Sequence, residues 1–153
     1  MSFSPNDVLE NTSPNVNLTC DAGVPGAKIS LVTLMQISKV MANGIDVPLV
    51  RMTPGSQQPT YLDLGDFRSR SHVTGDLRVS HPVYMQVQIR RPKTADTGLY
   101  RCSMSYVGTG HEVMDGSSHV HDHERLNVWS WESLLAEIDR LTQEKHRKCT
   151  TSA

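Results

Sequence analysis

Strict alternation of apolar and polar residues predicts β-strands in three segments of this chain. A period of two places successive side chains on opposite faces, which is typical of a strand with one buried face. The apolar faces are formed by Val16, Leu18 and Cys20, by Met85, Val87 and Ile89, and by Tyr100, Cys102, Met104 and Tyr106. The pattern therefore predicts a protein built on half-buried strands.

Other stretches predict strands from their composition and turn signals. Residues 29–40 are apolar almost throughout, so a strand is expected there but its two faces cannot be assigned. Asn43-Gly44 is a strong hairpin signal, and residues 47–52 form the expected return strand. A short strand is expected at residues 68–73, and Leu126 and Val128 end the β pattern.

The hydrophobic period changes after Ser130, which stands where the N-cap of a helix belongs. Apolar residues then recur at steps of three and four among good helix formers, from Trp131 through Leu134, Ile138 and Leu141 towards Lys145. The pattern predicts a β domain over residues 1–128, an amphipathic helix within 129–148 and a tail over 149–153. A short helix is marginal alone in water, so its apolar stripe, residues 131–145, is expected to pack on the sheets or on sister helices in a coiled coil.

Length and charge narrow the classes of function. A chain of 153 residues suits one domain with a short appendage. The net charge of −1, from 15 basic and 16 acidic residues, gives no reason to expect a nucleic-acid partner, because phosphate binding needs a basic face. No apolar run is long enough to cross a bilayer, so we expect no membrane span in this chain.

Two cysteines, Cys20 and Cys102, each fall on the apolar face of an alternating segment. The second ends the run Asp96-Thr97-Gly98-Leu99-Tyr100-Arg101-Cys102, and an apolar strand precedes that run. This ordered set resembles the immunoglobulin superfamily, and the long middle region is closest to its variable type, over roughly residues 10–128. The resemblance implies an all-β, two-sheet antiparallel sandwich, followed here by a short C-terminal α-helix.

The resemblance also implies a Cys20–Cys102 disulfide between the two sheets. The tryptophan that usually packs on this disulfide has no counterpart, because no Trp lies between the two cysteines. Leu34 or Val32 is therefore expected to fill the space, with looser packing around the bridge.

A tyrosine corner is a further implication of the resemblance. Asp96, Gly98 and Tyr100 would form it, with the phenol hydroxyl bonded to backbone a few residues upstream. In the variable type, an arginine before the fourth strand often pairs with the corner aspartate, and Arg70, or failing it Arg68, is the candidate.

A variable-type domain without a central Trp, joined directly to a short heptad helix, is also similar to the amino-terminal part of the secreted fibrinogen-related proteins of molluscs. That narrower resemblance implies a role in innate recognition and a lectin-like domain further along the protein. Two sequons, at Asn11 and Asn17, are candidate glycosylation sites in a secreted chain. The N-terminus lacks the basic and apolar regions of a secretory signal, so we expect the chain to be part of a longer extracellular protein.

Catalytic motifs are missing from the sequence. It contains no Gly-x-Ser-x-Gly, His-Glu-x-x-His or phosphate-loop pattern, so we expect a non-enzymatic protein that needs no cofactor. Binding of a protein or glycan ligand is expected on the loops, above all on the long hairpin over residues 107–123, with Gly23–Lys28 at the same end. The candidate contact residues in the hairpin are Tyr106, His111, Met114 and Asp115. An adhesion or structural role through a sheet face is the alternative.

Two further features leave their alternatives open. His119, His121 and His123 share one side of a strand and are weak candidates for a Zn²⁺ or Cu²⁺ site, against the simpler interpretation of a solvent-facing strand. Cys149 follows the helix, and either joins two chains or pairs with a cysteine beyond residue 153 of a longer protein.

Overall fold

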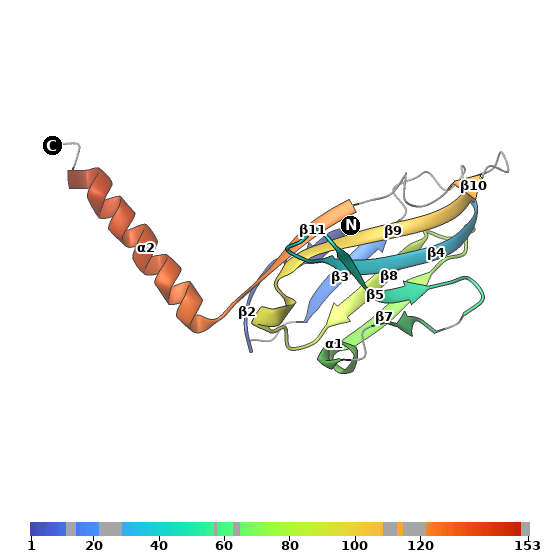
Figure 1. Cartoon of the computed structure of the whole chain (residues 1–153), viewed down its shortest axis with the longest axis horizontal. Coiled ribbons are helices and arrows are strands. Elements are labelled where there is room, and N and C mark those ends of the chain that lie inside the picture. The colour runs from blue at the N-terminus through green and yellow to red at the C-terminus, as the bar shows by residue number, and fades with distance from the viewer. Residues whose placement is uncertain are drawn as a thin grey trace.

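The computed structural model describes residues 1–11, 15–21, 29–56, 58–62, 65–108, 113–114 and 122–150. About half of the chain is β-strand, arranged in two sheets and followed by one long C-terminal helix (Figure 1). Apolar side chains from both sheets form a single core cluster. The expected all-β architecture of two sheets and a C-terminal helix is confirmed.

The smaller sheet has four antiparallel strands. Its order is β1 (Ser2–Ser4), β3 (Val16–Asp21), β8 (Tyr84–Ile89) and β7 (Ser71–Asp76). β3 pairs with β8 so that Leu18 faces Val87 and Cys20 faces Met85, and all four side chains are buried. The alternation in these two segments therefore correctly predicted both strands and their inward faces.

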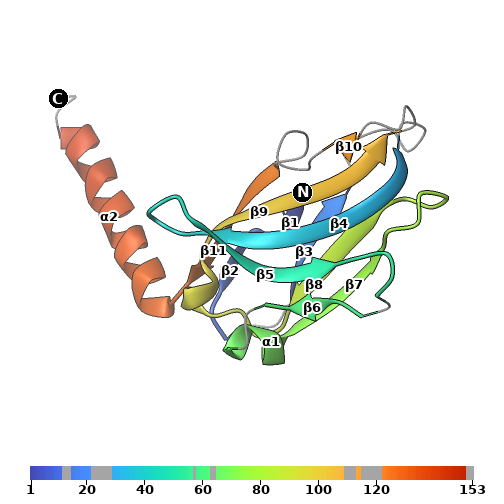
Figure 2. The ribbon, with the colours of Figure 1, turned by 45° about the vertical axis from the view of Figure 1, so that its right-hand side comes forward.

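The larger sheet has seven strands. Six follow the order β2 (Asp7–Leu9), β11 (Asp122–Trp129), β9 (Gly98–Gly108), β4 (Ile29–Val40), β5 (Asp46–Met52) and β6 (Thr60–Tyr61), while β10 (Val113–Met114) pairs with β9. β2 runs parallel to β11, which departs from a wholly antiparallel arrangement. The first β-strands of the chain are thus divided between the two sheets (Figure 2).

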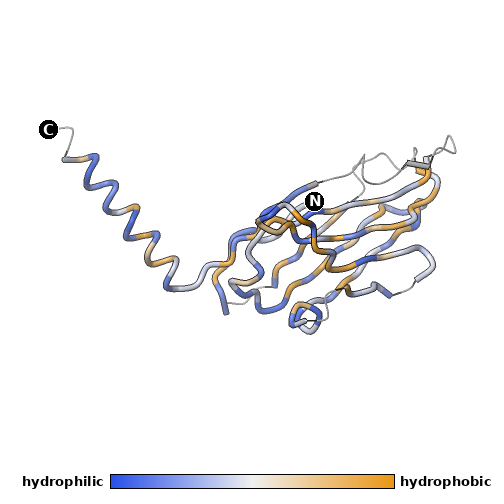
Figure 3. The backbone as a smooth tube through the Cα atoms, viewed as in Figure 1, coloured by the Kyte–Doolittle hydropathy of each residue, from blue (hydrophilic) through white to orange (hydrophobic). Residues whose placement is uncertain are grey.

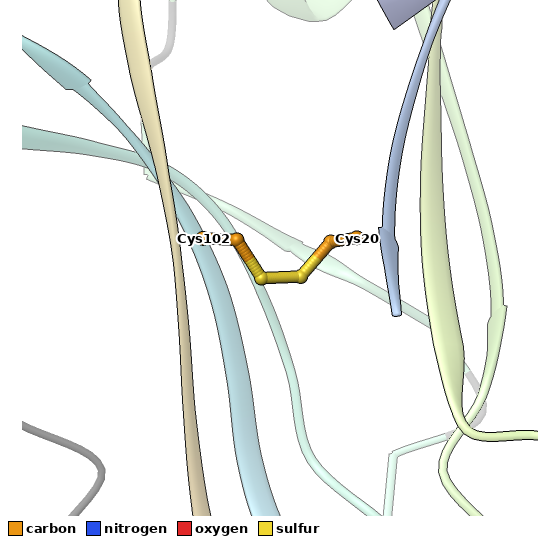
Figure 4. The surroundings of a disulfide bond; sticks show 2 residues. All are labelled: Cys20 and Cys102. Carbon is orange, nitrogen blue, oxygen red and sulfur yellow. A yellow bond between two sulfur atoms is a disulfide. The ribbon is translucent and has the colours of Figure 1, made fainter. Parts of the chain in front are cut away.

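A disulfide between Cys20 of β3 and Cys102 of β9 crosses the core and joins the two sheets (Figure 4). The two Cα atoms lie 6.0 Å apart, and both side chains are buried. Ile37 pairs directly opposite Cys102 and is fully buried beside the bridge. The expectation that Leu34 or Val32 fills this space is wrong, because irregularities in the pairing of β4 shift its faces and leave Leu34 half-exposed and Val32 opposite Tyr106.

The corner around Asp96 is formed as expected. Asp96 lies in a short 3₁₀ turn, Thr94–Asp96, and its carboxylate accepts two parallel bonds from Arg70, at 2.8 Å from Nη1 and 2.9 Å from Nη2. The Tyr100 hydroxyl donates to the Asp96 carbonyl at 2.6 Å. Arg70 and not Arg68 is therefore the partner, while the Arg68 guanidinium lies over the Tyr61 ring.

The buried ion pair of the corner is well satisfied. Asp96 and Arg70 are only 6% and 8% exposed, and the Lys93 backbone N–H adds a third bond to the carboxylate at 2.7 Å. Buried charges are tolerated when they are paired and hydrogen-bonded in this way. Gly98 leaves room for Lys39, whose Nζ reaches the Ala95 carbonyl at 2.7 Å, because a Cβ on Gly98 would lie 2.8 Å from Lys39 Cε.

The strand expected over residues 68–73 is wrong in its first half. Residues Asp66–Arg70 form a short helix, α1, and β7 begins at Ser71. Asp66 and Arg70 are one helical turn apart and form an ion pair at 2.7 Å, and Phe67 is buried beneath the turn. The i,i+4 ion pair and the bonds between Arg70 and Asp96 stabilise a helical turn here. The polar sequence of this segment gives little indication of its secondary structure.

The C-terminal helix α2 (Trp131–Thr150) has 20 residues and ends two residues beyond the expected limit at residue 148. Ser130 is its N-cap, since the Ser133 N–H donates to Ser130 Oγ at 3.1 Å and the Ser130 N–H donates to Ser133 Oγ at 3.1 Å. The helix extends away from the sandwich in both views, and none of its residues is buried (Figures 1 and 2). Its apolar stripe therefore does not pack on the sheets of its own chain.

Tyr100 makes the stability of the fold depend on pH. Burial raises the pKa of its phenol above the ordinary value of 10.0, because the ionised form would lie in the core. The folded chain therefore holds this proton more tightly than the unfolded chain. The stability that the neutral phenol contributes is fully present below pH 10.0 and is lost as the pH rises beyond it. Tyr100→Phe should lower the free energy of unfolding by about 1 kcal/mol at pH 7 and flatten the alkaline fall.

Denaturant unfolding at pH 7 to 11 measures both effects, with Tyr84→Phe as the control because Tyr84 is exposed. Lys39 contributes with the opposite sign, since burial lowers its pKa, so the comparison is always with the parent chain. An alkaline fall that is equally steep in Tyr100→Phe and in the parent would contradict the role given to the corner.

Candidate functional site

The two ends of the sandwich differ, and we name them by what they carry. At the loop end, β9 finishes beside the start of β4, because Gly108 pairs with Ile29. At the corner end lie Asp96, Tyr100 and the start of α2. The loop end is where binding is expected on sandwiches of this kind, since loops on a rigid scaffold carry function.

A groove of about 430 Å³ opens at the loop end. It is formed by the start of β4, the end of β5 with the turn after it, and residues 75–80, which continue from β7. The larger and the smaller sheet therefore both contribute to its wall. A volume of this size lies within the range of ligand pockets, at roughly 300–1,000 Å³.

Apolar side chains dominate the surface of the groove. Leu31 and Val79 are partly exposed there, at 46% and 37%, and Met52 and Leu77 lie buried behind them. The groove also depends on Gly75, because a Cβ there would lie 2.8 Å from Met52 Sδ and 2.7 Å from the Tyr84 carbonyl oxygen. Glycine at this position therefore lets Met52 and β8 approach closely.

Four polar side chains around the groove already form hydrogen bonds or ion pairs within the chain. Ser30 Oγ donates to the Val107 carbonyl at 3.0 Å, and Ser56 Oγ donates to the Gln58 carbonyl. The Arg78 guanidinium binds the Asp76 carboxylate, with Nε donating to Oδ1 at 2.9 Å and Nη2 donating to Oδ2 at 2.7 Å, and this lowers the pKa of Asp76. A ligand therefore meets an apolar surface beside polar side chains of which these four are already engaged.

The contact residues expected on the long hairpin are only partly described. Tyr106 is buried and lies between Val32 of β4 and Met114 of β10 in the sheet. His111 and Asp115 lie outside the described residues, as does the loop at Gly23–Lys28. Met114 is placed by its backbone pairing, at the same end of the sandwich as the groove.

The histidine run is described only at His123. His123 lies opposite Arg101 of β9, and Arg101 Nε donates to His123 Nε2 at 2.9 Å. Arg101 also contacts Asp46 through Nη1, so this ring nitrogen belongs to a charged network on the outer face of the larger sheet. No group of three metal-ligating side chains occurs within the described ranges, and His119 and His121 fall outside them.

The two sequon asparagines differ in their surroundings. Asn11 is exposed in a turn, with a φ of 60°. Asn17 lies within β3 between Ser4 and Gln88, is only partly exposed, and has a buried Oδ1. Asn11 is therefore the more accessible of the two for a glycan.

The helix α2 carries a second candidate surface. Trp131, Leu135, Ile138 and Leu141 are between 50% and 60% exposed, and apolar positions recur along the helix in Figure 3. Cys149 is exposed and lines the same surface as Ile138 and Leu141. No helix in the described part of the chain is long and apolar enough to cross a membrane.

No protein-family model matches the chain, and no curated protein matches its sequence. The class of protein therefore stays a prediction from the fold and the residues named above. Function is likewise inferred from the placement of side chains.

Sequence reasoning missed the groove at the loop end. Leu31 and Val32 are consecutive apolar residues, so one of them had to leave the core, and the break in the pairing of β4 turns Leu31 outward. These two adjacent apolar residues were the feature of the sequence that could have indicated an exposed apolar surface. No sequence pattern indicates that residues 75–80 line the same groove, because this depends on how the smaller sheet packs against the larger one.

Gly75→Ala tests the geometry of the groove. The added methyl group meets the Tyr84 carbonyl and Met52, so we expect a loss of about 1–3 kcal/mol in the free energy of unfolding. Gly55→Ala is the matched control, because a Cβ there has nothing within 4 Å. Thermal and denaturant unfolding measure both variants, and equal stability of the two would contradict the close approach described here.

Proposed function

We propose that the chain is a variable-type immunoglobulin module that binds a partner without catalysis. In the variable type, one sheet holds strands A, B, E and D, and the other holds G, F and C with two further strands. The orders β1-β3-β8-β7 and β11-β9-β4-β5-β6 correspond to this arrangement. The disulfide between β3 and β9 and the corner at Tyr100 add independent support.

We also propose an extracellular location for this module. A structural disulfide persists in oxidising compartments and is rare in the cytosol. The exposed Asn11 sequon fits the same location. The resemblance to the secreted fibrinogen-related proteins of molluscs stays a proposal of the same kind, and implies a role in innate recognition.

Binding is proposed at the loop end, and the groove beside Leu31 and Val79 is the observation that carries it. Its exposed apolar surface lies between elements of both sheets. Because Leu31 and Val79 are exposed there, while Ser30, Ser56, Asp76 and Arg78 already form bonds within the chain, the groove suits an apolar side chain of a protein partner better than the hydroxyls of a glycan. A protein ligand is therefore the preferred choice.

The outer face of the larger sheet is a weaker candidate for an adhesion contact. Gln36 Oε1 accepts from Arg51, and Arg101 binds Asp46 and His123, so this face holds a polar network. Exposed apolar side chains occur mainly at the β4–β5 turn, where Ile45 is 60% exposed. Interface cores are depleted in charged residues, which favours the groove over this face.

A random-peptide display library panned on the immobilised protein tests the groove. We expect selected peptides to share an aromatic or aliphatic anchor, and their binding to weaken at least about tenfold in Leu31→Glu, since a charge would enter an apolar contact. Ile45→Glu is the matched control, because it adds the same charge to an exposed apolar side chain far from the groove. Affinities are measured by titration with the purified peptides.

Equal loss of peptide binding in both variants, or selection of purely polar peptides, would contradict a binding role for the groove. The thermal midpoint of each variant serves as the check that its fold is retained.

The helix α2 is proposed to associate with the same helix of a second copy. Only Ser130 separates it from β11, and Trp129 is held by a bond from its Nε1 to Asp7 Oδ1 at 3.3 Å and by its carbonyl to Glu10. The helix therefore has little freedom to fold back on its own sandwich. An exposed apolar stripe of this length is most readily covered by another helix.

Ile138→Glu should convert the associated form to a monomer under reducing conditions, because it places a charge in the centre of the stripe. Ala136→Glu adds the same charge on the opposite face of the helix and should leave the mass unchanged. Light scattering after size-exclusion chromatography measures the mass. A monomeric parent chain at high concentration would refute self-association through α2.

A further inference from the structure

A second pocket, of about 410 Å³, lies at the corner end of the sandwich. It is lined by Asn11, Asp66, Ser69, Arg70, Arg91 and Lys93. These residues come from the turn after β2, from α1 and from the segment between β8 and the 3₁₀ turn. The pocket thus lies at the opposite end of the sandwich from the groove, and the two have no lining residue in common.

The backbone is unusual at two places in this pocket. Asn11 and Arg91 have φ angles of 60° and 47°, and within the described ranges they are the non-glycine residues with positive φ. Such a conformation costs about 1 kcal/mol or more for an ordinary residue, and it concentrates at functional sites. Two segments far apart in the sequence adopt it beside the same pocket.

The side chain of Arg91 is available to a ligand. Its carbonyl accepts a bond from Arg70 Nη1 at 3.2 Å, which holds the backbone in place. Its guanidinium, on an exposed residue, makes no hydrogen bond or ion pair within the described part of the chain. The corner therefore fixes the position of Arg91 without using its charge.

Positive charge is concentrated around the pocket. Arg68, Arg70, Arg90, Arg91 and Lys93 lie close in the chain or in contact, and Glu10, Asp66 and Asp96 are the acidic residues among them, which gives a local balance of +2. The whole chain carries −1. A surface with such a local excess attracts anions, and guanidinium groups suit oxyanions because they donate in a planar fork.

Asp66 determines which anions fit. Its Oδ2 accepts bonds from Arg70 Nε at 2.7 Å and from Lys93 Nζ at 3.0 Å, and these partners lower its pKa, so it is charged at neutral pH. A carboxylate in the wall opposes a bare anion, but it accepts a hydrogen bond from a hydroxyl group. The pocket thus combines cations for an anionic group with acceptors and donors for neutral hydroxyls.

We propose that this pocket binds a sulfated saccharide, with Arg91 and Lys93 contacting the sulfate and Asp66 and Ser69 facing sugar hydroxyls. A sulfated sugar carries both chemical groups that the pocket is built to meet. The proposed site shares no lining residue with the loop-end groove, so the two are tested independently.

The test uses a heparin-derived tetrasaccharide as the probe and the chain with Ser13→Ala, which removes the Asn11 sequon without changing the pocket residues. Binding is measured by titration calorimetry at low salt and at 150 mM salt. Arg91→Gln should weaken binding about tenfold, as expected for one charge-assisted contact. Arg125→Gln, which removes one exposed arginine charge elsewhere, should change the affinity less than about twofold.

Two further ligands test whether the sulfate and the sugar both contribute to binding. The desulfated tetrasaccharide and inorganic sulfate should each bind at least about tenfold more weakly than the sulfated probe, because each lacks one set of contacts. Equal losses in Arg91→Gln and Arg125→Gln would overturn the site, since they would reflect net charge alone. Binding of inorganic sulfate as tightly as the saccharide, or of phosphoinositide vesicles in its place, would overturn the choice of ligand.

Discussion

The distance between the two sheets is fixed where the Cys20–Cys102 disulfide crosses the core. The bridge joins a central strand of the smaller sheet to a central strand of the larger one, with Cα atoms 6.0 Å apart. Closing a loop of this length stabilises a fold by roughly 4 kcal/mol on the chain-entropy model. Ile37 is buried beside this bridge, and its aliphatic side chain fills less volume than the Trp that variable-type immunoglobulin domains, the class proposed for this chain, place there.

The two ends of the sandwich differ in chemical character, because the charged corner lies at one of them. Arg70 ties α1 to Asp96, and Tyr100 ties Asp96 to β9, so the corner end is rigid and charged. The same strands carry the apolar groove at the other end. Because α2 leaves from the corner end, association through the helix would leave the groove at the loop end uncovered, and a bivalent molecule gains avidity when both sites engage a common surface.

Short-range patterns were enough to predict most of the strands. Alternation located β3, β8 and β9 with their buried faces, and the resemblance carried by residues 96–102 implied the corner and its arginine. Prediction failed where long-range contacts determine the local structure. Residues 66–70 form a helix in which Arg70 bonds to Asp96, and Leu31 faces outward because β4 shifts its pairing with β9. The groove and the charged pocket each join segments distant in sequence, which no local pattern encodes.

The most direct test of the disulfide-linked sandwich is the intact mass of the protein after alkylation of accessible thiols under native conditions, with and without prior reduction. With the bridge formed, the native chain takes up no label at Cys20 or Cys102, and both are labelled once the protein is reduced and unfolded. Uptake of label by both cysteines in a chain that remains folded would contradict the disulfide-linked sandwich and the binding functions proposed for its two ends.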